Sequence, residues 1–228
     1  MKVLDLFAGL CGWSAPFSKR GHDVFSVDLD ERFDVSLHAD ILTLTPDDLP
    51  WRPDIILASP PCETFSVSSI GAHWLPGYQP RPSAVMGIAL VQATLDLIAA
   101  CDPAYWIVEN PRGVLRKLPL MAPYERRTVW YCHVGEDRGK PTDLWGKFPP
   151  SLYLPPKCHN QRETHAADCC CRDHNAAPRG SRTGTQGYGT YADRSKIPSQ
   201  LARAVCLAAE WDLAAGAAPI PTTIWQVA

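Results

Sequence analysis

Short apolar runs, each ended by glycine, proline or a polar residue, recur along the first half of the chain. Such runs predict buried strands at four places: Val3–Phe7, Val24–Val27, Ile55–Ala58 and Tyr105–Val108. Helical patterns lie between them: a short one over Trp13–Lys19, and a long one that begins at Ser83, a capping residue, and runs through Ala100. Strands that alternate with helices indicate an α/β fold with a parallel sheet and right-handed crossovers.

The pattern changes after Lys140. From Pro141 to Gly189 the chain is rich in Pro, Gly, Cys, His and Arg without a period, which predicts a small irregular insert. A last helix is expected over Pro198–Ala215, with an apolar face made of Leu201, Val205, Leu207, Ala208 and Leu213. We therefore divide the chain into a main domain over 1–148, an insert over 149–190 and a returning segment over 191–228.

Polar and glycine-rich residues follow several predicted strands. In parallel sheets ligands gather at the carboxyl ends of the strands, and that edge would carry the turn Phe7–Gly12, Asp28, the run Ser59–Cys62 and Glu109. Glycines let a ligand approach the backbone, and an acid after the second strand accepts ribose hydroxyls. Glycine also serves simply to turn a chain. Because the turn lacks a phosphate-binding Gly-Lys-Ser/Thr ending, it favours a nucleoside without a polyphosphate.

Cys62 follows two prolines at the end of a predicted strand. A lone cysteine is most often a structural core residue. Here Pro60 and Pro61 fix the backbone, so that the thiol is expected to project into the ligand crevice. Glu109 brings a carboxyl group to the same edge. A nucleophilic thiol beside a proton-donating acid suits covalent addition to an electron-poor ring.

Three motifs resemble those of the DNA cytosine C5 methyltransferases in order and spacing: Asp5–Gly12, Pro61-Cys62-Glu63-Thr64-Phe65-Ser66 and Glu109-Asn110. The resemblance implies a Rossmann-like, S-adenosylmethionine-dependent methyltransferase fold, a mostly parallel sheet with flanking helices and a small insert. It also implies that Cys62 attacks C6 of the cytosine and that Glu109 protonates N3. The base would be flipped out of the duplex, because C5 is unreachable inside the stack.

The same resemblance implies a site for S-adenosylmethionine. Phe7 is expected to stack on the adenine, Asp28 to hold the ribose, and Asp40 to contact the adenine amino group unless it is a plain surface acid. The expected cofactor residues are Phe7, Ala8, Gly9, Gly12, Trp13, Asp28, Leu29, Asp40, Ile41, Ser59, Pro61, Ser195 and Ile197. Ser195 stands where the family's closing motif has asparagine, which is a departure from the pattern.

Arg138 and Lys140 resemble the family's two arginines at this spacing, with lysine in the second place. One of them is expected to contact the cytosine O2 and to balance the charge of the adduct. The alternative is that they bind the phosphate backbone.

The net charge of −2 does not suggest a polyanionic partner, but the charge is uneven. Lys157–Arg203 holds eight Lys/Arg against four Asp/Glu, which is either a solvated surface or a phosphate-facing segment. The chain resembles compact phage-encoded members of the family in the runs Lys140–Trp145 and Arg179–Gly187, and its insert is short. We expect it to read a short site in double-stranded DNA through Arg179, Arg182, Thr183, Thr185 and Gln186.

Cysteine and histidine crowd one part of the insert. Because the segment is poor in apolar residues, it needs another source of order, and our candidate ligands for a structural zinc are Cys158, Cys169, Cys171 and His174. Their spacing is not a regular double Cys-x-x-Cys, so reduced loop thiols are the alternative. The odd total of nine cysteines argues against a secreted disulfide framework.

Composition describes one ordinary soluble domain of 228 residues, 46% hydrophobic and 20% charged. The longest apolar runs fall short of the roughly 20 residues that span a bilayer, and no signal-peptide pattern follows Lys2. We therefore expect a monomer without a membrane partner, in a bacterial cytoplasm or, for a phage protein, in that of the host. Two alternatives stay open: an RNA cytosine C5 methyltransferase, and a non-catalytic DNA-binding regulator or decoy.

Overall fold

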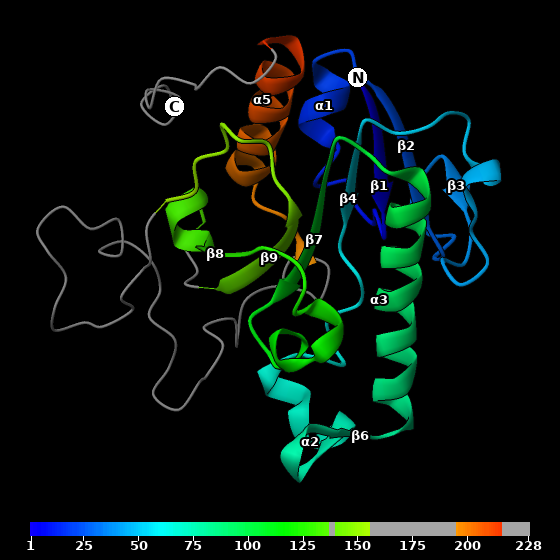
Figure 1. Cartoon of the computed structure of the whole chain (residues 1–228), viewed down its shortest axis with the longest axis vertical. Coiled ribbons are helices and arrows are strands. Elements are labelled where there is room, and N and C mark those ends of the chain that lie inside the picture. Colours follow the sequence, from blue (N-terminus) through cyan, green and yellow to red (C-terminus); the bar gives the residue numbers. More distant parts are fainter. Residues whose placement is uncertain (137–139, 156–194, 216–228) are drawn as a thin grey trace, which may run out of the picture.

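A seven-stranded sheet forms the centre of the computed structural model, which describes residues 1–136, 140–155 and 195–215 (Figure 1). The strand order is β3-β2-β1-β4-β7-β9-β8. The strands are β1 (Lys2–Leu6), β2 (Asp23–Asp28), β3 (Leu37–His38), β4 (Ile55–Ala58), β7 (Tyr105–Pro111), β8 (Arg126–Trp130) and β9 (Pro141–Lys147). The first five run parallel, whereas β9 is antiparallel to both β7 and β8. The expected α/β fold with a mostly parallel sheet is thus confirmed.

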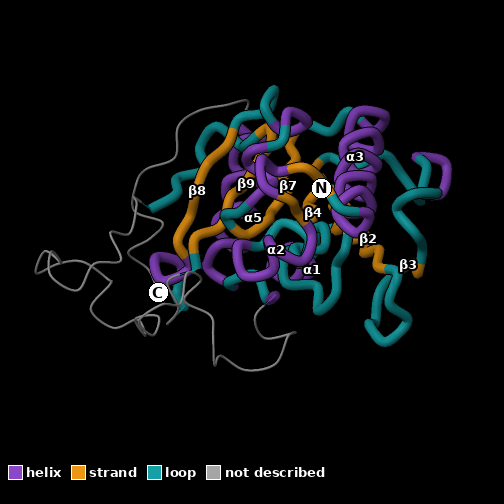
Figure 2. The backbone as a smooth tube through the Cα atoms, turned by 90° about the horizontal axis from the view of Figure 1, so that it is seen from below, coloured by secondary structure: helices purple, strands orange, loops and turns teal. Residues whose placement is uncertain are grey.

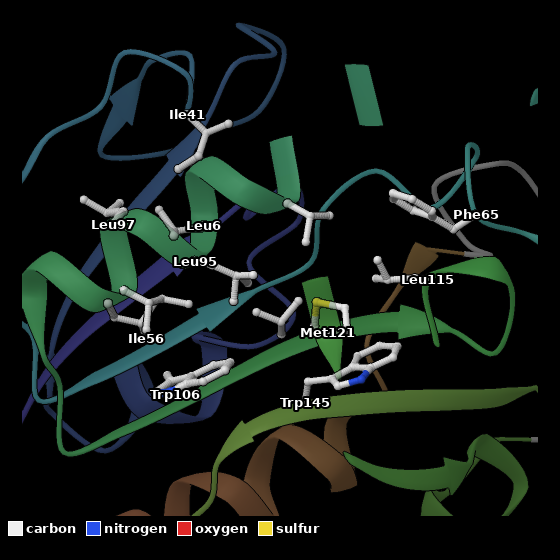
Figure 3. Close-up of a cluster of buried hydrophobic side chains, with 14 of the residues drawn as sticks. Leu6, Ile41, Ile56, Phe65, Leu95, Leu97, Trp106, Leu115, Met121 and Trp145 are labelled. Atoms are coloured by element: carbon white, nitrogen blue, oxygen red, sulfur yellow. The ribbon is translucent and has the colours of Figure 1, made fainter. Parts of the chain in front are cut away.

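Helices cover both faces of the sheet (Figure 2). α3 (Pro82–Cys101) lies on one face, and α1 (Ala15–Lys19) and α5 (Ser199–Ala215) pack against each other on the opposite face. In β4, Ile56 and Ala58 join the cluster under α3, whereas Ile55 and Leu57 join the cluster under α1 and α5. The whole strand is buried, as is usual for a central parallel strand. Figure 3 shows the cluster under α3, which includes Leu6, Ile56, Leu95, Leu97 and Trp106.

α3 is long and apolar enough to cross a membrane by length and composition alone. In this fold it packs on the sheet, with Val91, Leu95 and Ile98 in the core cluster, as the core helix of a globular domain does. Met86, near the start of this helix, is 54% exposed although it is apolar. Small residues occupy the buried stripe there instead: a Cβ added at Gly87 would lie 2.8 Å from the Thr64 side chain.

Two helix starts also differ from the expectation. Arg81 is the N-cap residue of α3, and Ser83 lies inside the helix with its hydroxyl 2.8 Å from the His73 ring. α1 begins only at Ala15, after Ser14. Both differences are of one or two residues, because each helix has a proline in its first turn, Pro16 in α1 and Pro82 in α3, which fixes that turn without a side-chain cap.

The expectation of irregular chain from Pro141 onward is wrong at its start, because β9 lies between β7 and β8 inside the sheet. Two buried polar residues, Thr142 and Asp143, interrupt the apolar pattern of this strand. Arg116 and Thr128 donate hydrogen bonds to the Asp143 carboxylate, which is how the sheet accommodates a buried acid.

A small substructure lies between the Cys62 loop and α3 in the sequence. It consists of α2 (Ile70–His73) and the antiparallel strands β5 (Trp74–Leu75) and β6 (Gln79–Pro80). Figure 1 places it beyond the carboxyl ends of the parallel strands, where the sequence predicts the ligand site.

Candidate active site

The carboxyl ends of four strands lie level with one another. The register aligns four residues in adjacent strands: Val27, Leu6, Ala58 and Val108. The residues that follow them in the chain are Asp28, Phe7, Ser59 and Glu109. Predicted site residues from distant parts of the sequence therefore meet at one edge of the sheet.

The turn after β1 has a strained backbone. Phe7 and Cys11 have φ angles of 57° and 53°, in the left-handed region that side chains disfavour, and Gly9 has a φ of 49°. Asp28 fixes this turn, because one carboxylate oxygen accepts the Gly9 N–H at 2.8 Å and the other accepts the Asp30 N–H at 2.9 Å. Such strain is typical of ligand-binding turns that the surrounding structure holds in place.

Two adjoining cavities of about 570 and 490 Å³ open beside the turn. Their shared walls are made by Phe7, Gly9, Asp30, Phe33, Ser59 and Ser195. Every residue predicted to bind the cofactor lines at least one of them: Phe7, Ala8, Gly9, Gly12, Trp13, Asp28, Leu29, Asp40, Ile41, Ser59, Pro61, Ser195 and Ile197. The fold thus gathers the whole predicted set around one space.

The closing segment reaches this space from the other end of the chain. A Cβ added at Gly12 would lie 3.4 Å from both the Cβ and the backbone nitrogen of Ile197. The first turn and the last segment are therefore in close contact, and glycine at position 12 leaves room for it.

Several wall residues were not predicted: Leu10, Asp30, Arg32, Phe33, Glu63, Leu90 and Lys196. Asp30 and Arg32 form an exposed ion pair of 2.5 Å, and a Cβ at Gly9 would lie 3.9 Å from the Phe33 ring. These three residues follow β2 in irregular chain, where no hydrophobic period marks them.

The walls combine apolar and acidic surfaces. Phe7, Leu29 and Ile41 provide the apolar part, and Asp28, Asp40 and Glu63 provide carboxyl groups. Such a cavity suits a nucleoside that carries positive charge and no phosphate, because the carboxylates attract a cation and accept hydroxyl and amino hydrogens.

Neighbouring segments hold the Cys62 loop in place. The N–H groups of Phe65 and Ser66 donate to the Cys62 carbonyl at 3.1 and 2.9 Å, and the Trp74 ring donates to the Thr64 carbonyl at 2.7 Å. Asn110 donates to the Pro60 carbonyl at 3.0 Å. The loop is therefore fixed on both sides of its cysteine, which is half-buried.

The electrostatics of Cys62 involve both predicted partners. Burial raises the pKa of the Cys62 thiol, the positive charge of Lys140 opposes that shift, and the negative charge of Glu109 adds to it. Both charged groups thus lie close enough to act on the thiol. Arg138, the other predicted cation, lies outside the described residues.

Glu109 is 5% exposed and has two neighbours that bear on its chemistry. The Tyr131 hydroxyl donates to its Oε1 at 2.9 Å, and the Lys140 ammonium lies 4.0 Å from the same oxygen. That ammonium also lies 4.7 Å from the centre of the Tyr131 ring. The sequence pattern alone predicts no role for Tyr131.

Asp5, inside the first motif, is a further titratable group beneath the turn. It is 1% exposed, and its Oδ2 accepts hydrogen bonds from the Ser14 hydroxyl at 2.6 Å and the Ser14 N–H at 3.2 Å. Burial raises the pKa of Asp5 to about 7, although the Ser14 bonds oppose the shift. Its carboxyl group thus links the end of β1 to the start of α1.

The predicted zinc ligands Cys158, Cys169, Cys171 and His174 lie outside the described residues, as do the predicted DNA-reading residues Arg179, Arg182, Thr183, Thr185 and Gln186. Among the described residues, His22, Cys206 and Glu210 bring possible metal-ligand atoms within 4.8 Å of one another. Arg20 and His22 both contact the same Glu210 oxygen at 2.6 Å. This carboxylate is already neutralised, so the cluster is an ion-pair network at the amino end of β2.

Comparison with known proteins bears on the same region. Residues 1–118 match the family model described as C-5 cytosine-specific DNA methylase. A protein of frog virus 3 named "Probable DNA (cytosine-5)-methyltransferase" is 30% identical over 153 residues, which are 64% of this chain and 70% of the viral protein.

Similar solved structures include a DNMT2 triple mutant of Spodoptera frugiperda, with 20% identity and a TM-score of 0.43 over 64% of this chain and 49% of that one. Another is the methyltransferase EhMeth of Entamoeba histolytica, with 12% identity and a TM-score of 0.46 over 72% of this chain and 57% of that one. The chain spans about half the length of these two proteins.

Proposed function

Because the chain belongs to the family of C-5 cytosine-specific DNA methylases, we propose that it transfers a methyl group from S-adenosylmethionine to C5 of a cytosine flipped out of duplex DNA. One observation carries this proposal: Cys62 lies on a loop that the strand of Glu109 anchors, and both Glu109 and Lys140 act on its thiol. A protein that only binds DNA needs neither the thiol nor the acid.

The cavity walls suit S-adenosylmethionine, which when bound supplies a methyl group on a positively charged sulfur. We assign Phe7 to the face of the adenine, Asp40 to its amino group and Asp28 to the ribose hydroxyls. Asp28 already accepts two backbone N–H groups, and a carboxylate has about four acceptor positions, so capacity for the ribose remains.

C5 of cytosine is a poor nucleophile, and the residues around Cys62 can activate it. The Cys62 thiolate forms a bond to C6 while Glu109 gives a proton to N3, and the electrons of the C5–C6 double bond then make C5 a nucleophile. The positive charge of Lys140 favours the ionised thiol and so opposes the effect of the burial of Cys62. When a base removes the C5 proton after methylation, the double bond forms again and the thiolate leaves.

We assign DNA recognition to the insert over 149–190. Arg179, Arg182, Thr183, Thr185 and Gln186 would contact double-stranded DNA, with Arg138 next to the cytosine and a zinc ion held by Cys158, Cys169, Cys171 and His174 ordering the segment. Arg179→Ala or Arg182→Ala is expected to weaken DNA binding, with a salt dependence lower by about one ion if the arginine meets phosphate. We further propose a monomer that works in a bacterial or host cytoplasm.

The test is a covalent trap. A duplex with 5-fluorocytosine at the target position is expected to form a stable adduct with the wild-type chain in the presence of S-adenosylmethionine, because fluorine does not leave as a proton. Cys62→Ser is expected to lose the adduct, and Cys101→Ser, a change at a buried cysteine on α3, to retain it. An adduct that survives Cys62→Ser would contradict the assignment.

The substrate is tested in the same assay with matched duplex DNA and RNA. We expect the adduct to form with DNA. An adduct with RNA alone would contradict DNA methylation and indicate that the chain methylates RNA. Bisulfite sequencing of DNA from cells that express the chain then reports the sequence context of the methylated cytosines.

A further inference from the structure

Tyr131 occupies a fully buried position at the point where β8 ends. Its side chain is 0% exposed and belongs to the apolar cluster that contains Val129, Val134 and Leu144. Phenylalanine would fill this space equally well, so packing alone does not call for a hydroxyl. A buried phenol needs a hydrogen-bond partner, and the partner here is the carboxylate of Glu109, at 2.9 Å.

Tyr131 touches both charged groups of the site. Its hydroxyl donates to Glu109 Oε1, and the Lys140 ammonium lies over its ring, 4.7 Å from the centre. The backbone supports this arrangement, because the Tyr131 N–H donates to the Lys140 carbonyl at 3.1 Å. Trp130 of β8 pairs with Pro141 of β9, and this pairing brings their chain neighbours Tyr131 and Lys140 side by side.

The two contacts have different physical effects. A donor to a carboxylate stabilises its ionised form and fixes the position of the oxygen that accepts the bond. An aromatic face restrains a desolvated ammonium by a cation–π interaction. The Lys140 ammonium is 4.0 Å from Oε1, which is long for a direct ion pair, so the tyrosine is the closer of the two restraints on this oxygen.

We propose that Tyr131 is a positioning residue for the methyl-transfer site: its hydroxyl holds Glu109 and its ring holds Lys140, so that the acid meets the cytosine N3 in one orientation. This inference rests on the proposed function. Tyr131 itself exchanges no atoms with the substrate. Glu109 gives its proton to N3 and takes it back when the thiolate leaves, and the phenol stabilises the carboxylate between the two transfers.

Tyr131→Phe is the direct test, because it removes one buried hydroxyl and keeps the ring under Lys140. We expect kcat for methylation of duplex DNA to fall roughly 10- to 100-fold, as befits the loss of a hydrogen bond to a charged group. Binding of S-adenosylmethionine, measured by calorimetry, should be unchanged, because Tyr131 does not line the cavities described above. Tyr124→Phe is the matched control, since Tyr124 lies against the other core cluster.

A pH profile separates this role from a merely structural one. On the alkaline side kcat/KM falls as the acid loses its proton, and removing a donor to the carboxylate favours the protonated form. In Tyr131→Phe the alkaline limb should therefore move to higher pH. Site-specific 3-fluorotyrosine at position 131 keeps the shape and strengthens the donor, so it should move the limb to lower pH, and it applies even if the phenylalanine variant does not fold.

A double-mutant comparison completes the design. In a Glu109→Gln background, Tyr131→Phe should cause little further loss of turnover, because its effect passes through the acid. A wild-type chain that forms no adduct with 5-fluorocytosine would contradict the proposed function itself. A wild-type chain that forms the adduct, with variants at 131 that keep both kcat and the alkaline limb, would overturn only the role of Tyr131.

Discussion

The Nδ2 of Asn110 donates a hydrogen bond to the carbonyl oxygen of Pro60 across 3.0 Å. Asn110 follows Glu109 on β7, and Pro60 lies two residues before Cys62. The bond therefore joins the strand of the acid to the loop of the nucleophile. Asn110 is 0% exposed, and its Oδ1 has no hydrogen-bond partner in the described part of the chain. One side-chain amide thus sets the relative position of two groups that must act on the same ring.

Asn110→Ala is expected to slow adduct formation by about 10-fold or more, since loosening the loop misplaces the thiol relative to N3 and C6. The lost buried bond should also lower the free energy of unfolding by roughly 1–3 kcal/mol. The rate of trapping by 5-fluorocytosine and urea unfolding measure the two effects. Gln92→Ala, which removes an exposed amide bonded to Asp96 on α3, should change neither. Equal trapping rates for Asn110→Ala and wild type would contradict this prediction.

A second contact on the same loop depends on the absence of a side chain. A Cβ added at Gly113 would lie 2.0 Å from the Phe65 carbonyl oxygen, a backbone atom that cannot swing away. Gly113→Ala is therefore expected to destabilise the fold by about 1–3 kcal/mol or more and to displace the Cys62 loop. Gly71→Ala is the control, because nothing lies within 4 Å of its Cβ position and alanine favours a helix. Thermal unfolding of the two variants should differ clearly, and similar melting temperatures would rule out the steric account.

The elements predicted well from sequence are those whose burial is one-sided or complete. β4 has the predicted bounds, Ile55–Ala58, because four consecutive apolar residues between polar boundaries admit few alternatives. The edge of the sheet that holds the site follows from the same strands, since parallel strands end at one level. This is why the predicted cofactor residues meet around one space.

Two of the misses share a physical cause, which is that a polar group is buried together with its partner. β9 carries Asp143 in the sheet interior, and nothing local indicates that Arg116 neutralises it. In the sequence, Tyr131 has the pattern of an ordinary aromatic core residue, and only the structure shows its hydroxyl beside Glu109. Such pairs form only in three dimensions, so periodicity along the chain does not reveal them.

The Arg116–Asp143 pair supports a stability prediction. Asp143 is 0% exposed, and Arg116 binds both of its oxygens, at 2.8 and 2.5 Å. Arg116→Ala leaves a buried carboxylate without its charge partner and is expected to cost about 3–5 kcal/mol of unfolding free energy. Arg32→Ala breaks the exposed pair with Asp30 and should lower the free energy of unfolding far less, because water screens that pair. Urea unfolding that gave equal losses for both variants would contradict the distinction between buried and exposed pairs.

The buried carboxyl group of Asp5 makes the stability of the fold depend on pH. Burial raises the pKa of Asp5 from 3.8 to about 7. Between these two values the folded chain keeps a proton that the unfolded chain has lost, so the free energy of unfolding falls as pH rises from about 4 to about 7 and is level above that range. The decline from this group is at most about 1.4 kcal/mol per pH unit. Asp5→Asn removes the titrating group, while its amide oxygen still accepts the Ser14 hydrogen bonds. As pH rises from about 4 to about 7, the variant should therefore gain stability relative to wild type.

Urea unfolding of both chains at several pH values between 4.5 and 8 checks this expectation, because groups common to the two chains cancel in the difference. Asp30→Asn is the control: the bonds from Arg32 lower the pKa of Asp30 to about 2, so its contribution changes only below pH 4. If the stability difference between Asp5→Asn and wild type were constant from pH 4.5 to 8, Asp5 would titrate alike in the folded and unfolded chains. The carboxyl group would then be ionised throughout this range, with the Ser14 hydrogen bonds and the start of α1 offsetting its burial.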